Sequence, residues 1–356
     1  MRQADTSRLR TRDILAKCET GESLDLEDVA HLFKQKDPCV RETVALAAGY
    51  LKERHFGRRI VLFAPLYLSN DCVNNCLYCG FRRVNASVPR RTLTVPEAIR
   101  EAEVLAARGF RRVLLVAAEH PTKVSARYLG QVIEAILRET PIQDVTVNAA
   151  PMPVEDFRVL QEAGGSAYQC FQETYEPSAY GRAHVSGKKR EYAWRAEVMD
   201  RALEAGFTRI GLGILLGLWD FRDDLLSLVT HARRLLSQCP VLHMVVSLPR
   251  FRPAIGAALA EPPFPVSDEE FAYAVAVCRL ALPSAEIAIS TRERAGFRDD
   301  LMERGASMMS AGSLTWPGGY SGVSGSGATG QFAIEDSRSV GEVCTALIAR
   351  GLAPVL

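Results

Sequence analysis

The sequence predicts a closed barrel of eight parallel strands, each followed by a helix, and three observations support this α/β fold class. From residue 60 onward, short apolar or β-branched runs alternate with longer amphipathic stretches. The alternation occurs eight times, as a (β/α)8 barrel of the TIM type requires. With 356 residues and 47% hydrophobic content, the chain can bury a full core, which suits one large barrel as well as two ordinary domains.

The expected strands and helices follow one another in a regular order. Strands are expected at residues 60–68, 112–118, 144–149, 168–172, 209–215, 242–248, 286–290 and 306–310. The helix at 94–108 has Pro96 in its first turn and Gly109 as its stop signal, and the helix at 192–205 is closed by Gly206. In such a barrel the loops that follow the strands bind the ligands.

Two smaller segments flank the expected barrel of residues 59–316. Residues 1–58 predict polar helices, and apolar stripes at 25–33 and 40–53 favour a helical cap on the barrel. Residues 317–356 begin with a Gly- and Ser-rich tract that is expected to be flexible, and a linker or a lid are both open interpretations. A strand at 331–334 and a helix at 340–350 are then expected to end the chain.

The charge balance limits the kind of partner. The chain has 43 basic and 42 acidic residues, so no overall field favours nucleic acid or an anionic membrane. The first residues are charged, and no apolar run is long enough for a secretory signal or a membrane span. We therefore expect a cytoplasmic protein whose partner is a small molecule.

Cys72, Cys76 and Cys79 form a close group directly after the first expected strand. Three thiolates on one loop would hold a 4Fe-4S cluster and leave one iron open to another ligand. A zinc site is the alternative, but it needs a fourth protein ligand, and no second Cys or His pair is nearby. Tyr78, between two of these cysteines, is expected either to contact a cofactor or to shield the cluster. The six other cysteines are scattered, and we expect them to pack as small apolar side chains.

Polar side chains also end three further strands. Glu119 ends the second strand, Asn148 the third, and Glu173 the fourth, where Thr174 and Tyr175 follow. Salt bridges to neighbouring arginines would explain each of these residues singly, whereas their convergence favours a ligand with an amine and hydroxyls.

Arginines supply the positive charge expected at the same end of the barrel. Arg250 and Arg252 follow the sixth strand, Arg292 follows the seventh, and Ser310 ends the eighth. Arginine is suited to holding a carboxylate with two parallel hydrogen bonds, and Arg292 is the first candidate for this role. Arg195, near the start of a helix, is a second candidate, with a solvated helix face as the alternative.

Several segments resemble the radical S-adenosylmethionine (radical SAM) superfamily, and within it the aromatic amino-acid lyases. These segments are APLYLSN at 64–70, CVNNC at 72–76, FQETY at 171–175, PRFRPA at 249–254, STRE at 290–293 and SAGS at 310–313. The resemblance covers the chain from about residue 30 to its end. That lyase family includes the tyrosine lyase that matures FeFe hydrogenase and the thiamine-pathway 2-iminoacetate synthase.

The resemblance implies one 4Fe-4S cluster on the three cysteines and S-adenosylmethionine as the second cofactor. The residues it implies for S-adenosylmethionine are Tyr78, Glu119, Asn148, Glu173 and Arg195. Arg292 and Ser310 would hold the substrate carboxylate, and an external donor of flavodoxin or ferredoxin type would supply one electron. A 5'-deoxyadenosyl radical would then start cleavage of the Cα–Cβ bond, giving p-cresol and dehydroglycine if the substrate is tyrosine.

Two departures from the family leave alternatives open. Ala117 and Ala118 stand where the superfamily has glycines before Glu119, which is expected to shift S-adenosylmethionine slightly. Beyond the barrel only Cys344 is present, so we do not expect the maturase's auxiliary cluster or its carbon monoxide and cyanide chemistry. The rival hypotheses are the same chemistry on tryptophan, a non-catalytic iron-sulfur assembly partner, and a zinc barrel.

Overall fold

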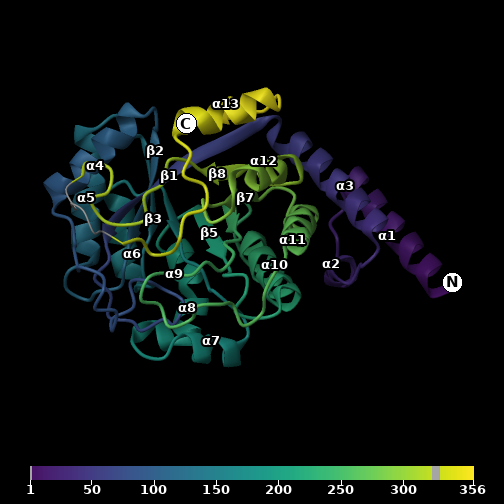
Figure 1. Ribbon diagram of the computed structural model, residues 1–356, viewed down its shortest axis with the longest axis horizontal. Coiled ribbons are helices and arrows are strands. Elements are labelled where there is room, and N and C mark those ends of the chain that lie inside the picture. Colours follow the sequence, from purple (N-terminus) through teal and green to yellow (C-terminus); the bar gives the residue numbers. More distant parts are fainter. Residues whose placement is uncertain (1, 323–328) are drawn as a thin grey trace.

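The computed structural model describes residues 2–322 and 329–356, and it contains the predicted barrel (Figure 1). All strand pairs are parallel, the strands from β2 to β8 are neighbours in chain order, and β1 closes the barrel by pairing with both β2 and β8. The barrel strands are β1 (Arg59–Ser69), β2 (Arg112–Ala117), β3 (Asp144–Asn148), β4 (Ala167–Gln169), β5 (Arg209–Gly213), β6 (His243–Ser247), β7 (Glu286–Ile289) and β8 (Met308–Ser310). The eight strand predictions are therefore confirmed, with ends that differ by a few residues.

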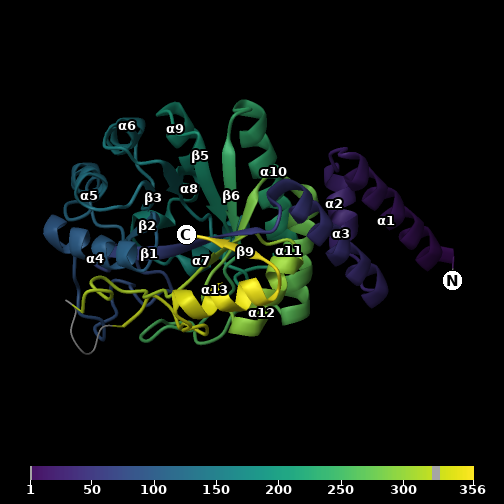
Figure 2. The same cartoon turned by 90° about the horizontal axis from the view of Figure 1, so that it is seen from above.

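Helices form the outer layer around these strands, as Figure 2 shows from above. They are α4 (Val95–Ala107), α5 (Ala126–Glu139), α6 (Val154–Glu162), α7 (Pro177–Ala183), α8 (Tyr192–Ala196), α9 (Val198–Glu204), α10 (Phe221–Gln238), α11 (Asp268–Ala281) and α12 (Ala295–Glu303). Thr94 and Glu97 form a capping box at the start of α4, and Gly109 follows its end with a φ of 99°. The expected start and stop of this helix are both present.

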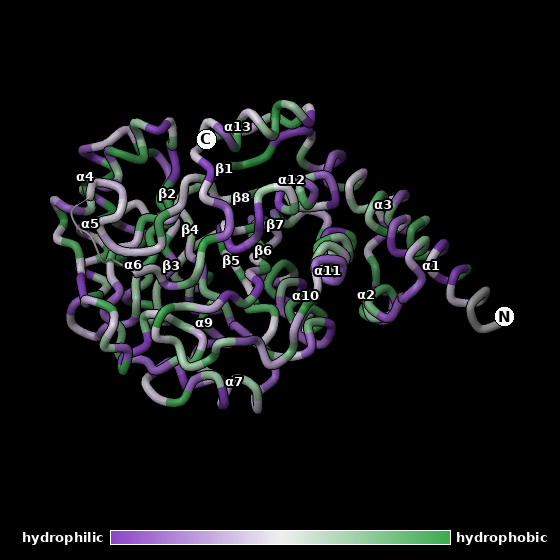
Figure 3. Tube along the Cα trace, viewed as in Figure 1, coloured by the Kyte–Doolittle hydropathy of each residue, from purple (hydrophilic) through white to green (hydrophobic). Residues whose placement is uncertain are grey.

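The core lies between the strands and the inner faces of the helices. Along β1 the residues from Ile60 to Ser69 are buried apart from Phe63, because a parallel strand is covered on both faces. Figure 3 shows the corresponding hydrophobic stretch along β1. Such a packed core leaves the polar side chains at the strand ends as the main source of chemistry.

The N-terminal helices pack mainly against outer helices of the barrel, and Phe56 at the end of the third helix lines a cavity at the amino ends of the strands, so the cap stays a prediction. These helices are α1 (Arg2–Thr20), α2 (Leu26–Phe33) and α3 (Pro38–Phe56). α3 packs along α11, and α2 packs against α10 and α11, so they extend the helical layer sideways (Figure 2). The hydroxyl of Tyr273 on α11 donates to the carbonyl of Leu32 at 2.7 Å. Their apolar stripes therefore cover a barrel helix.

The helix expected at 192–205 is two helices, α8 and α9, with a break at Glu197. The guanidinium of Arg201 donates to the carbonyl of Trp194 and its Cζ lies 3.7 Å from the centre of the Trp194 ring. In a continuous helix that carbonyl would instead bond the amide of Val198. The side-chain contact thus replaces the helical hydrogen bond at the break.

The C-terminal strand was expected in the wrong place. Residues 331–334 form no strand, because Gln331 bonds two loops: its amide donates to Thr315 O and its carbonyl accepts from Gly80 N, each at 3.0 Å. The chain continues through α13 (Val340–Ala349) into β9 (Ala353–Val355), which pairs with the start of β1. Residues 323–328 of the Gly- and Ser-rich tract lie outside the described residues.

Candidate active site

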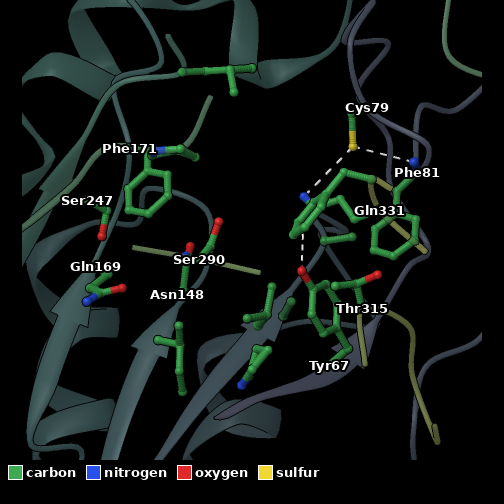
Figure 4. Close-up of a pocket in the computed structure, with 18 of the residues that line it drawn as sticks. Tyr67, Cys79, Phe81, Asn148, Gln169, Phe171, Ser247, Ser290, Thr315 and Gln331 are labelled. Atoms are coloured by element: carbon green, nitrogen blue, oxygen red, sulfur yellow. Dashed lines mark hydrogen bonds between the residues drawn. The ribbon is translucent and has the colours of Figure 1, made fainter. Parts of the chain in front are cut away.

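A cavity of about 210 Å³ opens at the carboxyl end of the barrel, where the loops after the strands meet. Figure 4 shows part of its lining. The ten residues predicted to hold the cluster, the cofactor or the substrate all line this one cavity: Cys72, Cys76, Tyr78, Cys79, Glu119, Asn148, Glu173, Arg195, Arg292 and Ser310. They come from loops spread over more than 230 residues, and barrel closure brings them together.

The three thiols lie on the loop that follows β1. Backbone amides point at two of the sulfurs: Asn74 N lies 3.5 Å from Cys72 Sγ, and Phe81 N lies 3.4 Å from Cys79 Sγ. Burial nevertheless raises the pKa of Cys76 to about 12 and also raises the pKa of Cys79. Iron would offset this desolvation, because metal binding favours the thiolate.

The donor set fits a cluster with an open corner better than a zinc ion. Within the described residues, no group of three or more His, Cys, Asp or Glu side chains is placed to hold a single metal ion. The three thiols nonetheless line the same cavity, as a larger cluster with several metal atoms requires. Three sulfurs would hold the cluster and leave its fourth corner facing the cavity.

Glu173 combines an unusual backbone with two cationic neighbours. Its φ of 72° is the only positive value at a non-glycine residue in the described parts of the chain. Its carboxylate lies 2.6 Å from Lys189 Nζ and 3.8 Å from Arg195 Nη2. Burial opposes ionisation, but Lys189 and Arg195 outweigh it and lower the pKa of Glu173 to about 2. A strained residue of this kind, held as a carboxylate in a cavity, is typical of a functional site.

Lys189 is a site residue that sequence reasoning missed. It belongs to a Lys-Lys-Arg run, which from the sequence alone is typical of a solvated surface. In the structure its ammonium also lies 5.6 Å from the centre of the Tyr78 ring. No local pattern distinguishes it from Lys188, which is exposed.

Glu119 is tied to the cysteine loop. Its carboxylate accepts from Asn74 Nδ2 at 2.6 Å, and its carbonyl accepts from Val73 N at 2.9 Å. Ala117 and Ala118 line the cavity beside it. Asn74, the second residue missed from the sequence, therefore links the metal-binding loop to a predicted cofactor residue.

Tyr78 lies inside the site against a buried histidine. Nδ1 of His184 lies 2.8 Å from Tyr180 O, a carbonyl that can only accept, so Nδ1 carries the proton. His184 Nε2 then accepts from the Tyr78 hydroxyl at 2.9 Å. Burial lowers the pKa of His184 to about 3, so the ring is neutral at physiological pH. Both expected roles of Tyr78 fit this position.

Arg292 has a positive charge without a carboxylate partner. Its guanidinium stacks on Phe332, with Cζ 3.4 Å from the ring centre, and it makes no side-chain hydrogen bond or ion pair with a described residue. The hydroxyl of Ser310 lines the same cavity and accepts from Thr291 N at 3.1 Å. An unpaired guanidinium in a cavity is suited to an anionic ligand.

The other expected arginines are not available to a ligand in this way. Glu293, which is 1% exposed, accepts from Arg250 Nε at 3.2 Å and from Arg252 Nη2 at 3.0 Å. Arg250 also pairs with Asp268 at 2.7 Å. Arg250 and Arg252 do follow the sixth strand as expected, but both guanidiniums already bind the carboxylate of Glu293, so neither is left for a ligand.

Two further expectations need correction. Thr174 and Tyr175 point away from the cavity: Asp224 on α10 accepts from Thr174 Oγ1 at 2.9 Å and from Tyr175 N at 2.7 Å. These bonds fix the backbone that follows Glu173. Cys39 is exposed at the start of α3, so not all of the isolated cysteines pack as apolar side chains.

Gln331 is a third residue that the sequence did not indicate. Its Oε1 accepts from the Tyr67 hydroxyl at 2.8 Å, and its Nε2 lies 3.9 Å from Cys79 Sγ (Figure 4). It comes from the segment beyond the barrel, where the sequence predicted a strand and no site residue. A contact over 250 residues leaves no sequence signal.

Comparison with known proteins defines the class. The profile of the Radical SAM superfamily matches residues 66–231, and that of the Biotin and Thiamin Synthesis associated domain matches residues 247–353. Together with the barrel and the three cysteines, these matches make the chain a radical SAM enzyme. Such an enzyme uses a 4Fe-4S cluster and S-adenosylmethionine, which confirms the expected cofactors.

Relatives then give the particular family. The chain is 33% identical to the 2-iminoacetate synthase of Salmonella typhimurium and 35% identical to that of Escherichia coli; each match covers 93% of this chain and 86% of the relative. It belongs to their family of radical SAM carbon-carbon lyases. The resemblance stated from the sequence is confirmed.

Solved structures agree with this assignment. A structure of HydG, a maturase of the FeFe hydrogenase, matches with a TM-score of 0.92 and 36% identity over 98% of this chain and 76% of that chain. HydG from Carboxydothermus hydrogenoformans matches with a TM-score of 0.89 and 38% identity over 97% and 79% of the two chains. No helix in the described part of the chain is long and apolar enough to cross a membrane.

Proposed function

We propose that this protein cleaves the Cα–Cβ bond of L-tyrosine to give p-cresol and dehydroglycine. The family assignment supports the reaction type, because the relatives are named 2-iminoacetate synthases and 2-iminoacetate is another name for dehydroglycine. The observation that carries the proposal for this chain is the unpaired guanidinium of Arg292, which shares one cavity with the three cysteines.

The residues of the cavity divide into two sets by chemistry. Cys72, Cys76 and Cys79 would hold the cluster, and when bound, the cluster and S-adenosylmethionine supply a carbon radical that abstracts hydrogen. Glu119 and Glu173 would contact the amine or ribose of S-adenosylmethionine, and Arg195, Asn148 and Tyr78 complete its expected surroundings. The carboxylate of Glu173 stays ionised above a pH of about 2, so it can accept hydrogen bonds throughout the physiological range.

Arg292 would orient the substrate through its carboxylate. A bidentate pair with that carboxylate would fix the amino group of tyrosine relative to the cluster, with Ser310 beside it. Phe332 would hold the guanidinium plane by stacking, since their distance of 3.4 Å leaves no room for a ligand between them. The role of both residues is therefore positioning of the nitrogen from which hydrogen is taken.

The far side of the cavity offers unused polar groups for a hydroxylated side chain. The side chains of Gln169 and Ser247 line it, and neither has a hydrogen-bond partner among the described residues (Figure 4). A phenol hydroxyl can donate and accept, so it could satisfy at least one of these groups, whereas a phenylalanine ring would leave them unpaired. This favours tyrosine as the substrate.

The test is reconstitution under anaerobic conditions with dithionite, S-adenosylmethionine and tyrosine, followed by assays for p-cresol and 5'-deoxyadenosine. We expect both products in wild-type protein. Formation of 5'-deoxyadenosine without p-cresol would reject tyrosine, and a screen that includes tryptophan would then find the substrate. Absence of both products from cluster-containing protein would favour a non-catalytic assembly role.

We also propose that a one-electron carrier of flavodoxin or ferredoxin type reduces the cluster. Cleavage of tyrosine to p-cresol and dehydroglycine is redox-neutral, but conversion of S-adenosylmethionine to methionine and 5'-deoxyadenosine consumes two electrons and a proton. A one-electron carrier would deliver these electrons one at a time. Three free thiols beside the cavity suit a reducing compartment such as the cytoplasm.

A further inference from the structure

An acid-free, cation-rich surface surrounds the cysteine loop. Residues 72–96 contain four arginines and no Asp or Glu, and residues 177–190 contain four Lys or Arg and again no Asp or Glu. The chain as a whole carries a formal charge of only +1. These two segments are therefore locally positive in a chain whose charges otherwise nearly cancel.

The fold joins these two segments into one surface. Asn75 N donates to Ser186 O and Leu77 N donates to Ala183 O, each at 2.9 Å, and Cys76 and His184 form an isolated β-bridge. A third loop joins them, since Ala258 N donates to Leu77 O at 2.8 Å and Asn85 Nδ2 donates to Ile255 O at 2.8 Å. The surface thus covers the loop that carries the cluster ligands.

Most of its cations lack a carboxylate partner. Three of the eight have internal roles: Arg90 donates to backbone carbonyls of its own loop, Arg91 pairs with Glu97, and Lys189 pairs with Glu173. The other five form no ion pair with any described residue: Arg82, Arg83, Arg182, Lys188 and Arg190. Elsewhere many arginines are paired, for example Arg234 with Asp200 at 2.6 Å.

Exposed apolar side chains lie among these cations. Val84 is 58% exposed, Val185 is 43% exposed and Ile255 is 62% exposed, and each belongs to one of the three joined loops. Apolar residues within a ring of charge are the usual composition of a protein–protein interface. Nucleic acid would need the cations but not these aliphatic side chains.

We propose that this surface is the docking site for an acidic one-electron carrier protein, with Arg83, Arg182 and Lys188 as its charged contacts and Val84, Val185 and Ile255 as its apolar centre. The proposal rests on the proposed function, which requires electrons from outside the chain, delivered one at a time. One electron leaves the reduced carrier and enters the cluster, with no bond formed or broken. Transfer weakens steeply with distance, and Arg82 and Arg83 are only three and four residues beyond Cys79.

The charges would act mainly on encounter and orientation, because opposite fields steer association and suppress wrong orientations. The exposed carboxylates Glu191 and Glu261 border the same loops and would repel an acidic protein placed beyond the patch. The charges therefore favour one position of an acidic carrier on this surface as well as its binding.

The test uses the charge-reversal variant Arg83→Glu/Arg182→Glu in the full, cluster-containing enzyme. Its control is Arg127→Glu/Arg158→Glu, which makes the same charge change on exposed residues of the outer helices α5 and α6. Formation of 5'-deoxyadenosine is measured with dithionite, with reduced flavodoxin and with reduced ferredoxin. This readout follows electron delivery whatever the amino-acid substrate is. Binding of each carrier is measured separately by calorimetry.

We expect the patch variant to lose about tenfold or more in rate and affinity with at least one carrier, because two interfacial charges are reversed. Its rate with dithionite and the behaviour of the control variant should stay at the wild-type level. Added salt should weaken the wild-type interaction and reduce the difference between the variants.

Three results would overturn the proposal. The first is an unchanged rate with both carriers, and the second is an equal fall in rate with dithionite and with the carriers. The third is a patch variant that binds both carriers as the wild type does but no longer binds a short single-stranded RNA that the wild type binds. Failure of the proposed function would give a different result, because wild-type enzyme would then form no 5'-deoxyadenosine with dithionite. In that case calorimetry of carrier binding to the patch and control variants would still test the docking surface.

Discussion

Arg279 and Arg292 lie on either side of strand β7 and show how the two ends of the barrel differ. Arg279, on α11 before β7, is fully buried, and backbone carbonyls surround it: Nε donates to Gly305 O at 2.9 Å, and Nη1 donates to Pro283 O at 3.0 Å. Arg292, after β7, stacks on Phe332 and has no acceptor among the described residues. The first arginine fastens loops at the amino end, and the second is left for a ligand at the carboxyl end.

The comparison teaches that burial alone does not identify a functional arginine. A buried donor must be satisfied, and the protein can do so itself or leave it to a ligand. Around Arg279 the satisfaction is internal, so the group stabilises the fold. Around Arg292, and around the thiols beside it, satisfaction requires a bound partner.

The largest effect is expected at the thiols, where the ligand is the cluster itself. Cys76→Ser should abolish stable cluster binding and all 5'-deoxyadenosine formation, because only two cluster ligands remain. Iron and sulfide content and visible absorbance measure the loss. Cys39→Ser is the matched control, since Cys39 is exposed and far from the cavity lining, and it should leave both unchanged. A full cluster in Cys76→Ser protein would contradict the assignment of Cys76 as a cluster ligand.

The two arginines themselves give the next prediction. Arg292→Met should lower kcat/KM for tyrosine by about a hundredfold or more, because a charged partner of the carboxylate is lost, with little change in the free energy of unfolding. Arg279→Met should instead lower the free energy of unfolding by about 3 kcal/mol, since several carbonyls lose their donor. Steady-state kinetics and urea unfolding measure the two effects. If both variants lose stability equally, Arg292 is structural and the contrast fails.

Glu173 should show a mixed effect, because it meets both the protein and the ligand. Glu173→Gln leaves Lys189 and Arg195 without their counter-charge, so we expect about 3 kcal/mol less stability and weaker S-adenosylmethionine binding, both measurable by unfolding and calorimetry. Glu204→Gln changes an exposed glutamate on α9 and should change neither. Retention of wild-type affinity in Glu173→Gln would remove this residue from the proposed cofactor contacts.

The pH dependence of Glu173 follows from its lowered pKa. An unfolded glutamate titrates near 4.3, and the folded one at about 2, so its stabilising contribution is complete above about pH 5 and is lost as the pH falls toward 2. The range from about pH 5.5 to about pH 8 lies about one unit or more above 4.3, so the charge of Glu173 should not change within it. A step in binding over that range that vanishes in Glu173→Gln would contradict the assignment.

The smallest effect is expected at Asp224, which supports the site from outside. Burial raises its pKa to about 6, whereas an unfolded aspartate titrates near 3.9. The folded state therefore holds the proton more tightly, and this contribution to stability is complete below about pH 4 and lost as the pH rises through about 6. Asp224→Asn should remove a pH-dependent difference of at most about 3 kcal/mol. Asp223→Asn, at the exposed neighbour, should retain it; equal pH profiles for the two variants would contradict the prediction.

Local sequence patterns were sufficient for the barrel and for much of the site. The order and number of the strands follow from hydrophobic alternation, and the proposed cluster ligands were predicted from the spacing of Cys72, Cys76 and Cys79, because both signals lie within short stretches of chain. The strand-end rule then placed Glu119, Glu173 and Arg292 at the correct end of the barrel. These features depend on periodicity and topology, which the amino-acid order carries by itself.

Only the tertiary structure decided which polar groups are already satisfied. Glu293 neutralises Arg250, Lys189 faces Glu173, and Gln331 reaches Cys79 across the molecule. It also placed the N-terminal helices beside α11 and put the closing strand at β9. Such pairings depend on distances between segments far apart in the chain. The identity of a residue in the sequence does not show whether a charged or polar partner lies near it in the fold.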